Sequence, residues 1–164
     1  MAIKDALLPE FDHEMAVTRK VLERVPEDKF GWAPHEKSMT LGRLAGHIAD
    51  IPSWVSETMT RDTVDMSGDY TPYVPTSRAE VLQRFDSLVA AARPLLDGAT
   101  DGQYMAMWSL TSRDQELFSA PKAVVLRSFV LNHLVHHRGQ MTVYLRLTGV
   151  PVPSIYGPSA DEAS

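Results

Sequence analysis

The stretch KAVVLRSFVLNHLVHHRGQMTVYLRLT, residues 122–148, decides the fold of this chain. It follows Pro121, which suits the first turn of a helix, and it stops before Gly149 and Pro151, which end one. Because the stretch is apolar on most sides, it predicts a buried helix about 40 Å long. Such a helix requires other helices packed around it.

Three further segments repeat apolar residues at the three- and four-residue spacing of a helix face. These are residues 3–25, 40–55 and 77–98. The second contains Pro52, which should kink the helix or end its regular hydrogen bonding. The third begins at Ser77 with the pattern of a capping box. With residues 122–148 they predict four helices, for which a bundle is the natural packing.

The regions between these helices are less regular. Residues 62–75 are rich in Gly, Pro and polar residues, so we expect a loop. In residues 103–120, Tyr104, Ala106 and Trp108 alternate with Met105, Met107 and Ser109, which is compatible with a short hairpin or with a twisted loop. The predicted fold class is therefore all-α, a four-helix bundle forming one domain over residues 1–164.

Composition excludes several classes of protein. The 164 residues include 16 Lys and Arg against 21 Asp and Glu, a net charge of −5. That balance argues against binding to nucleic acid or an anionic membrane surface. No Cys is present, which excludes disulfides, iron–sulfur clusters and a Cys nucleophile. The sequence shows no secretory signal and no membrane span, so we expect a cytoplasmic protein.

Histidines interrupt two of the apolar stripes. His133 and His137 lie one helical turn apart on the inward face of the last helix, so their imidazoles can chelate one ion. His136 projects sideways and is a second choice. His47 takes a stripe position between Leu44 and Ile51 on the second helix. If these helices pack side by side, His47 faces the other two histidines.

Three His ligands with an open fourth position are typical of a catalytic divalent-metal site. Nitrogen ligands suit Zn, Ni, Fe or Cu and disfavour Mg and Ca. The alternative is that these are core histidines that donate to backbone carbonyls. Near the site, Gln140 could bond a ligand imidazole, whereas Arg138 is better explained by contacts to neighbouring loops. Asp50, one turn from His47, is a weak candidate for a general base.

Two segments resemble the DinB family of damage-inducible, YfiT-like metal-binding proteins. They are TRKVLERVPEDKFGWAPHEKSMTLGRLAGHIADIPSW, residues 18–54, and HLVHHRGQMTVYLRLTGVPVPSIYGPSADE, residues 133–162. The resemblance implies a four-helix bundle, often dimeric, with a divalent metal on three histidines. By motif match these are His47, His133 and His137, with Zn or Ni as the expected metal.

The resemblance also implies an activity class. Better-understood relatives in the wider superfamily are metal-dependent transferases or isomerases that use low-molecular-weight thiols. A thiol cosubstrate would supply the sulfur that a chain without Cys lacks. A hydrolase that activates water at the same three-histidine site is the other reaction type that we expect. The alternative is a non-catalytic stress-response module in which the metal serves structure or dimerisation. We expect a small-molecule substrate, a homodimer and no nucleic-acid or membrane partner.

Overall fold

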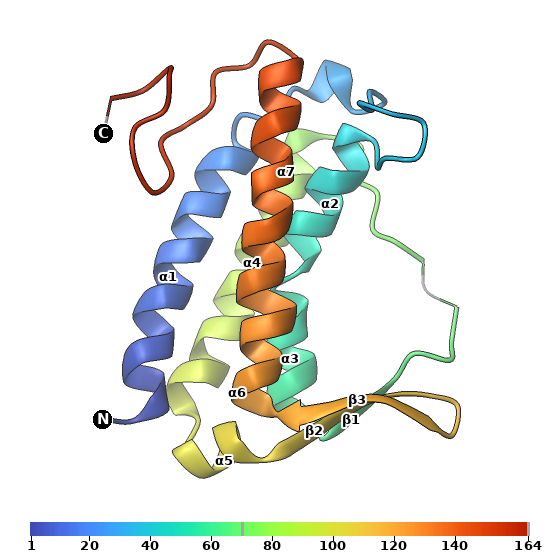
Figure 1. The fold of residues 1–164 in the computed structure, drawn as a ribbon, viewed down its shortest axis with the longest axis vertical. Coiled ribbons are helices and arrows are strands. Elements are labelled where there is room, and N and C mark those ends of the chain that lie inside the picture. The colour runs from blue at the N-terminus through green and yellow to red at the C-terminus, as the bar shows by residue number, and fades with distance from the viewer. Residues whose placement is uncertain (70, 164) are drawn as a thin grey trace.

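The computed structural model describes residues 1–69 and 71–163, and the stretch that begins at Lys122 forms its central column (Figure 1). This column has three consecutive parts: α6 (Lys122–Val125), a π-helical segment η2 (Leu126–Asn132) and α7 (His133–Leu147). Gly149 then adopts a φ of 76°, a conformation that favours glycine, and the helix ends there. The predicted helix is present, but its middle is wound more loosely than the sequence pattern suggests.

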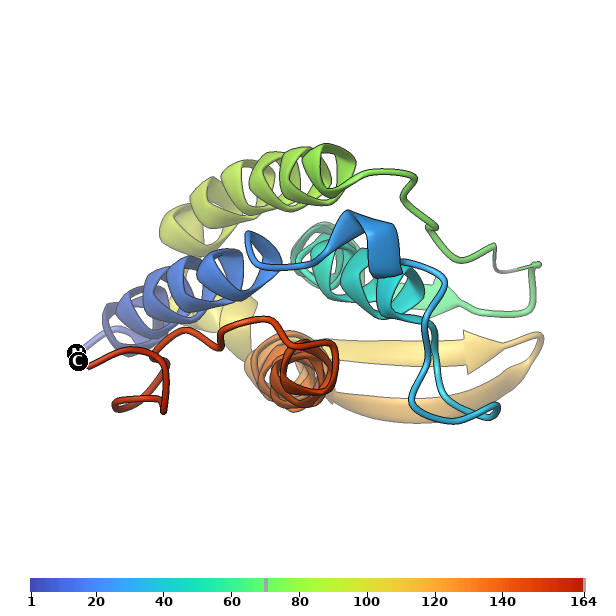
Figure 2. The ribbon, with the colours of Figure 1, turned by 90° about the horizontal axis from the view of Figure 1, so that it is seen from above.

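Three other helical segments pack around this column. They are α1 (Ile3–Leu22), the pair α2 (Leu41–Asp50) and α3 (Ser53–Thr60), and α4 (Arg78–Gly98). Seen from above, α4 covers the side of α1 and α2 that faces away from α7 (Figure 2). Pro52 lies in the break between α2 and α3, as its rigid ring predicts. Because His47 precedes this break, it keeps its place on the inward face of α2.

Helix starts follow the sequence signals closely. The side chain of Thr40 accepts a hydrogen bond from the Arg43 N–H at the start of α2. Ser77 likewise accepts from the Glu80 N–H at the start of α4. The Glu80 carboxylate, however, accepts from the N–H and hydroxyl of Thr76 at 2.8 Å. In the expected capping box this carboxylate would accept from the Ser77 N–H, but it accepts instead from the preceding residue.

A small three-stranded sheet lies at one end of the helices, so the chain is mostly helical but not purely all-α as expected. Strands β2 (Met107–Ser112) and β3 (Gln115–Pro121) form an antiparallel hairpin, preceded by the short helix α5 (Asp101–Met105). This confirms the hairpin over the twisted loop. The third strand, β1 (Thr63–Asp65), pairs in parallel with β2 in the order β1-β2-β3.

The strand β1 occupies part of the segment 62–75, for which we expected only loop; residue 70 of that segment lies outside the described residues. The reason is long-range pairing: Thr63 aligns with Ser109 and Val64 with Leu110, and the Met66 N–H donates to the Thr111 carbonyl at 2.8 Å. A three-residue strand has too little local signal to be recognised from its own sequence.

The main core lies between the helices and is mostly apolar. Its largest fully buried side chains include Phe11, Leu22, Leu41, Leu44, Ile48, Phe85, Leu96, Tyr104 and Leu126. A second apolar cluster around Trp108, Ala120 and Val125 joins the sheet to the helices. Within residues 1–69 and 71–163, no helix combines the length and the hydropathy needed to cross a membrane.

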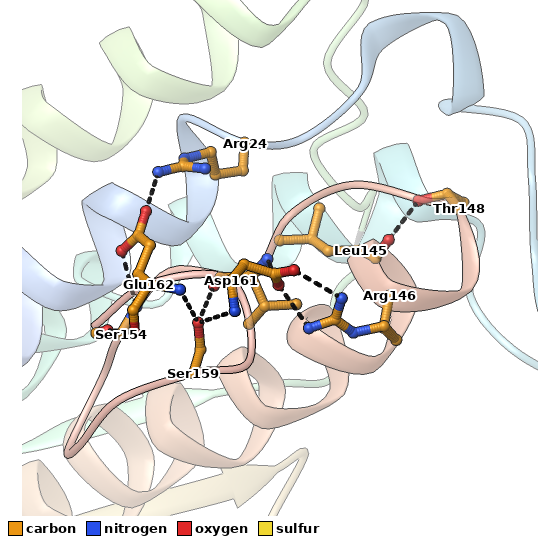
Figure 3. Close-up of polar contacts among 9 residues, drawn as sticks. Arg24, Leu145, Arg146, Thr148, Ser154, Ser159, Asp161 and Glu162 are labelled. Atoms are coloured by element: carbon orange, nitrogen blue, oxygen red, sulfur yellow. Dashed lines mark hydrogen bonds and ion pairs between the residues drawn. The ribbon is translucent and has the colours of Figure 1, made fainter. Parts of the chain in front are cut away.

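The segment after α7 folds back along the top of the molecule and is held there by ion pairs (Figure 3). Arg146 of α7 pairs with Asp161, and Arg24, just beyond α1, pairs with Glu162. The hydroxyl of Ser159 donates to the Val152 carbonyl at 2.7 Å and closes the loop. The short 3₁₀ turn η1 (Glu27–Lys29) follows α1 on the same side of the molecule (Figure 1).

Candidate metal centre

The three histidines selected from the sequence lie together between α2 and α7. His47 lies in the last turn of α2, His133 is the first residue of α7, and His137 follows one turn later. One ligand nitrogen from each lies within 4.8 Å of the others. The Nε2 atoms of His47 and His133 are 3.2 Å apart. The group could therefore hold one metal ion.

The spacing can be compared with known coordination geometry. Two nitrogen ligands at the usual Zn–N distance, in a tetrahedral arrangement, are about 3.3 Å apart. The 3.2 Å between the Nε2 atoms of His47 and His133 is close to that value. The ring centroids of His47 and His137 are 4.5 Å apart, and those of His133 and His137 are 4.7 Å apart. The donor set thus fits a single nitrogen-ligated ion.

Hydrogen bonds fix the orientation of the two imidazoles on α7. His133 Nδ1 lies 3.3 Å from the carbonyl oxygen of Phe129, to which it can only donate. His137 Nδ1 lies 2.7 Å from Gln140 Oε1, which accepts in the same way. With the proton on Nδ1, the lone pair of each ring is on Nε2 and is free to bind a metal.

Burial favours the neutral form of all three imidazoles. Burial lowers the pKa of His47 to about 4, and the neighbouring His137 and His133 contribute to the shift. Burial also lowers the pKa of His133 and of His137, although the contacts to Phe129 and Gln140 oppose it. An imidazole must be neutral to bind a metal, so this environment favours the ligating form near neutral pH.

A cavity of about 420 Å³ opens directly beside two of the histidines. His47 and His133 lie at one side of it, and the indole of Trp54 from α3 lies at another. Trp54 is braced edge-on by Phe129 and Trp108, with ring centroids 5.5 and 6.3 Å away. The site is therefore accessible to a small molecule rather than sealed inside the core.

The secondary candidates behave differently. His136 is exposed and lies outside the three-histidine group, although its ring centroid is 4.7 Å from that of His137. Asp50 lies beside His47, but its Oδ1 accepts from Arg84 Nη2 at 2.6 Å and from Nε at 3.0 Å. A carboxylate held by a guanidinium in this way is a poor general base.

Arg138 is buried and does more than support nearby loops. Its guanidinium pairs with Glu14 of α1 at 2.6 Å and donates to the Thr18 hydroxyl at 3.2 Å. It also donates to the hydroxyl of Tyr156, which in turn donates to Glu14 at 2.9 Å. This buried network joins α1, α7 and the C-terminal segment directly behind the histidine group.

Sequence reasoning missed most of the cavity. Val64 and Met66 line it from β1 and the residue after β1, and Glu57 lines it from α3. Their role depends on the sheet, which brings β1 beside α3 through pairing with a hairpin far along the chain. The one available signal was Trp54, a large aromatic residue four positions after Asp50.

The fold and the site define a class: a mostly helical protein in which two neighbouring helices bring three histidines together, two of them lining an open cavity. The chain belongs to the DinB family, whose sequence profile matches residues 1–164. This confirms the resemblance read from the sequence.

Individual proteins agree with the family assignment. An uncharacterised Bacillus subtilis protein, YrdA, is 27% identical over 159 residues, covering 96% of this chain and 90% of that protein. A DinB-like protein from Bacillus cereus has 28% identity and a TM-score of 0.73, covering 94% of this chain and 98% of that one. A second DinB-like structure, YjoA of Bacillus subtilis, has 18% identity and a TM-score of 0.69, covering 92% and 96% respectively; it supports the fold alone.

Proposed function

We propose that this protein is a divalent-metal-dependent enzyme in which His47, His133 and His137 hold one Zn or Ni ion. The observation that carries the proposal is the 3.2 Å separation of the His47 and His133 Nε2 atoms beside an open cavity. A bound ion of this kind acts as a Lewis acid and lowers the pKa of a water or thiol at its open position.

The chain's own residues would prepare the site for that chemistry. The Phe129 carbonyl and the Gln140 amide hold the α7 imidazoles with Nε2 turned toward His47. Arg84 holds Asp50 away from the role of an additional ligand. Trp54, Val64 and Met66 give the cavity apolar surface near His47 and His133, and electrostatic interactions are stronger beside such a surface than in water.

We further propose a low-molecular-weight thiol as cosubstrate, in an S-transferase or isomerase reaction. The chain has no Cys, so a reacting sulfur must come from outside. A smaller recess of about 100 Å³ also reaches His47, and Arg43 lines it. Glutathione and bacillithiol carry carboxylates, for which an arginine side chain is a suitable partner. If the recess binds no thiol, activation of water in a hydrolase remains the alternative reaction.

Metal content tests the ligand assignment. Untagged wild-type protein is compared with His47→Ala and His137→Ala by mass spectrometry, with His136→Ala as the matched control because that histidine is exposed and outside the group. We expect about one metal per chain in the wild type and in the control, and none in the other two. Equal metal in all four proteins, or none after supplementation, would overturn the proposal.

Thiol binding separates an enzyme from a non-catalytic metal module. Cobalt-substituted protein is titrated with glutathione and with bacillithiol, and a sulfur-to-cobalt absorption band is the expected result. A protein that gains thermal stability with metal but shows no such band would instead be the non-catalytic module. The proposed homodimer is checked separately by light scattering on the same samples, and a cytoplasmic location by fractionation of the source cells.

A further inference from the structure

The cavity beside the histidines has two walls of different origin. One wall is α3, which presents Ser53, Trp54 and Glu57. The other is the edge of the sheet, which presents Val64 and Met66. Between them the cavity reaches the imidazoles of His47 and His133, so a molecule that fills it would be in contact with the metal ligands.

The sheet wall is fixed in place by several hydrogen bonds. Met66 N–H donates to the Thr111 carbonyl at 2.8 Å. The Asp65 carboxylate accepts from the Ser67 N–H and hydroxyl and from the Arg113 N–H, at 2.8–3.1 Å. The Met66 side chain is nevertheless 40% exposed, which is high for a large apolar residue. A partly exposed methionine held on a fixed backbone is well placed to contact a bound apolar molecule.

The charges around the cavity argue against an acidic ligand. Among the nine described residues that line it, the only ionic side chains are Asp50 and Glu57, with no Lys or Arg. Arg84, outside the lining, pairs with Asp50. Glu57 Oε2 lies 2.9 Å from Arg61 Nη1 without a hydrogen bond of normal geometry. In the metal-free protein, an anion in this cavity would therefore meet two carboxylates, each paired with an arginine outside the lining, and no lining cation.

We propose that this cavity binds an uncharged apolar molecule with an aromatic ring, the second substrate of the metal centre. The inference rests on the proposed function where it calls this molecule a substrate, but the binding site itself does not require the metal. The indole of Trp54 offers an aromatic surface for stacking, and its bracing by Phe129 and Trp108 means that little ordering is needed on binding. Val64 and Met66 add apolar side chains to the lining of the same cavity.

Two fluorescent probes with the same ring skeleton test the proposal. N-phenyl-1-naphthylamine is uncharged, whereas 1-anilinonaphthalene-8-sulfonate differs by one sulfonate. Each is titrated into wild-type protein, into Met66→Glu, which adds a third carboxylate to the lining, and into Met107→Glu. Met107 is the matched control because it is a 56% exposed methionine on β2 outside the cavity.

We expect the uncharged probe to bind wild type and Met107→Glu equally and Met66→Glu at least about tenfold more weakly, a difference of about 1.4 kcal/mol. The sulfonated probe should bind chelator-treated wild type at least about tenfold more weakly than the uncharged one. Equal binding to Met66→Glu and wild type would overturn the proposal, as would tighter binding of the sulfonated probe. Circular dichroism of each variant checks that the fold is retained.

The titrations are repeated on chelator-treated wild type and on His137→Ala, because His137 is a proposed ligand that does not line the cavity. Uncharged probe bound by both proteins, with no metal in either, supports the cavity whatever the fate of the metal proposal. Stoichiometric metal in the wild type without probe binding overturns the cavity proposal alone. The two failures are thereby distinguished.

Discussion

The Nε2 atoms of His47 and His133 lie 3.2 Å apart, although 86 positions separate the two residues in the chain. Two neutral imidazoles at this distance can share at most one hydrogen, whereas a metal ion can use both lone pairs. At a Zn²⁺ or Ni²⁺ concentration 100 times the dissociation constant, we expect the free energy of unfolding to rise by about 2.7 kcal/mol. For a chain of this size the melting temperature should rise by about 5–10 °C. Differential scanning calorimetry of the wild type measures it.

The same calorimetric experiment has an internal control. The metal-induced rise should vanish in His133→Ala and persist in His136→Ala, since only the former residue belongs to the group. A rise of equal size in both variants would show that the ion binds elsewhere.

Gln140 should control the affinity for metal without touching the ion. Its Oε1 accepts from His137 Nδ1 at 2.7 Å, and loss of such a partner typically weakens metal affinity about 10–100-fold. We expect this for Gln140→Ala, with recovery in Gln140→Glu, whose carboxylate can accept the same proton. Competition with a chromophoric chelator measures the affinity. Gln83→Ala, at an exposed position on α4, should behave as wild type.

Arg138 and Glu14 should be strongly coupled in stability. Both side chains are buried, and removal of one leaves an unpaired charge, so Arg138→Met should lose about 3–5 kcal/mol in the free energy of unfolding. The double variant Arg138→Met with Glu14→Leu should recover most of that loss, because no charge is then left buried. Urea denaturation of the two single variants and the double variant completes the cycle, and additive losses would contradict the coupling.

Gly46, next to His47, is required by close packing. A Cβ at this position would lie 2.6 Å from Pro75 Cδ and 2.7 Å from the Tyr73 carbonyl oxygen, which is too close for either. Gly46→Ala should therefore cost about 1–3 kcal/mol of stability. The matched substitution Gly139→Ala meets nothing within 4 Å and should stabilise α7 by about 0.5–1 kcal/mol. Chemical denaturation gives both values, and losses of the same size would refute the packing argument.

The C-terminal segment should detach as the pH falls. The Arg146 guanidinium holds the pKa of Asp161 below its ordinary value, and the Ser154 N–H does the same for Glu162. A carboxyl whose pKa is depressed by folding stabilises the folded state above its unfolded pKa, about 4. That stabilisation is lost as the pH falls through the depressed value.

Amide hydrogen exchange of residues 152–162 measures this release. Protection factors should fall below about pH 4 while those of the buried helices persist. In Asp161→Asn the acid-dependent part of the loss should shrink, because one of the two titrating groups is gone. Protection that stays constant down to acid pH would contradict the assignment.

The sequence was sufficient for the helices and the histidines because each depends on local information. The stripe spacing places His133 and His137 on one face, and the stripe around His47 places that residue inward; packing of α2 against α7 then brings them together. The Gln140 contact followed from the same helical spacing.

Other features depend on partners that are distant in the chain and carry no local pattern. The strand β1 exists because it pairs with β2, and the carboxylate of Asp50 forms an ion pair with Arg84 of another helix. Glu14, the partner of Arg138, could not be inferred from the sequence, because any acidic residue facing inward from a neighbouring helix could form the same ion pair. The π-helical winding of η2 is likewise invisible to a search for the regular α-helical period.

The sheet has an implication for how such proteins diversify. Val64 lies on β1 and Met66 directly after it, in a segment separate in sequence from every histidine of the group, and the hairpin that supports this strand lies in yet another part of the chain. Changes at these two positions can alter which molecule is admitted while all three imidazole nitrogens stay in place. Under the proposed function, one metal chemistry would thus be directed to new compounds by substitutions at a few residues in and directly after a short edge strand.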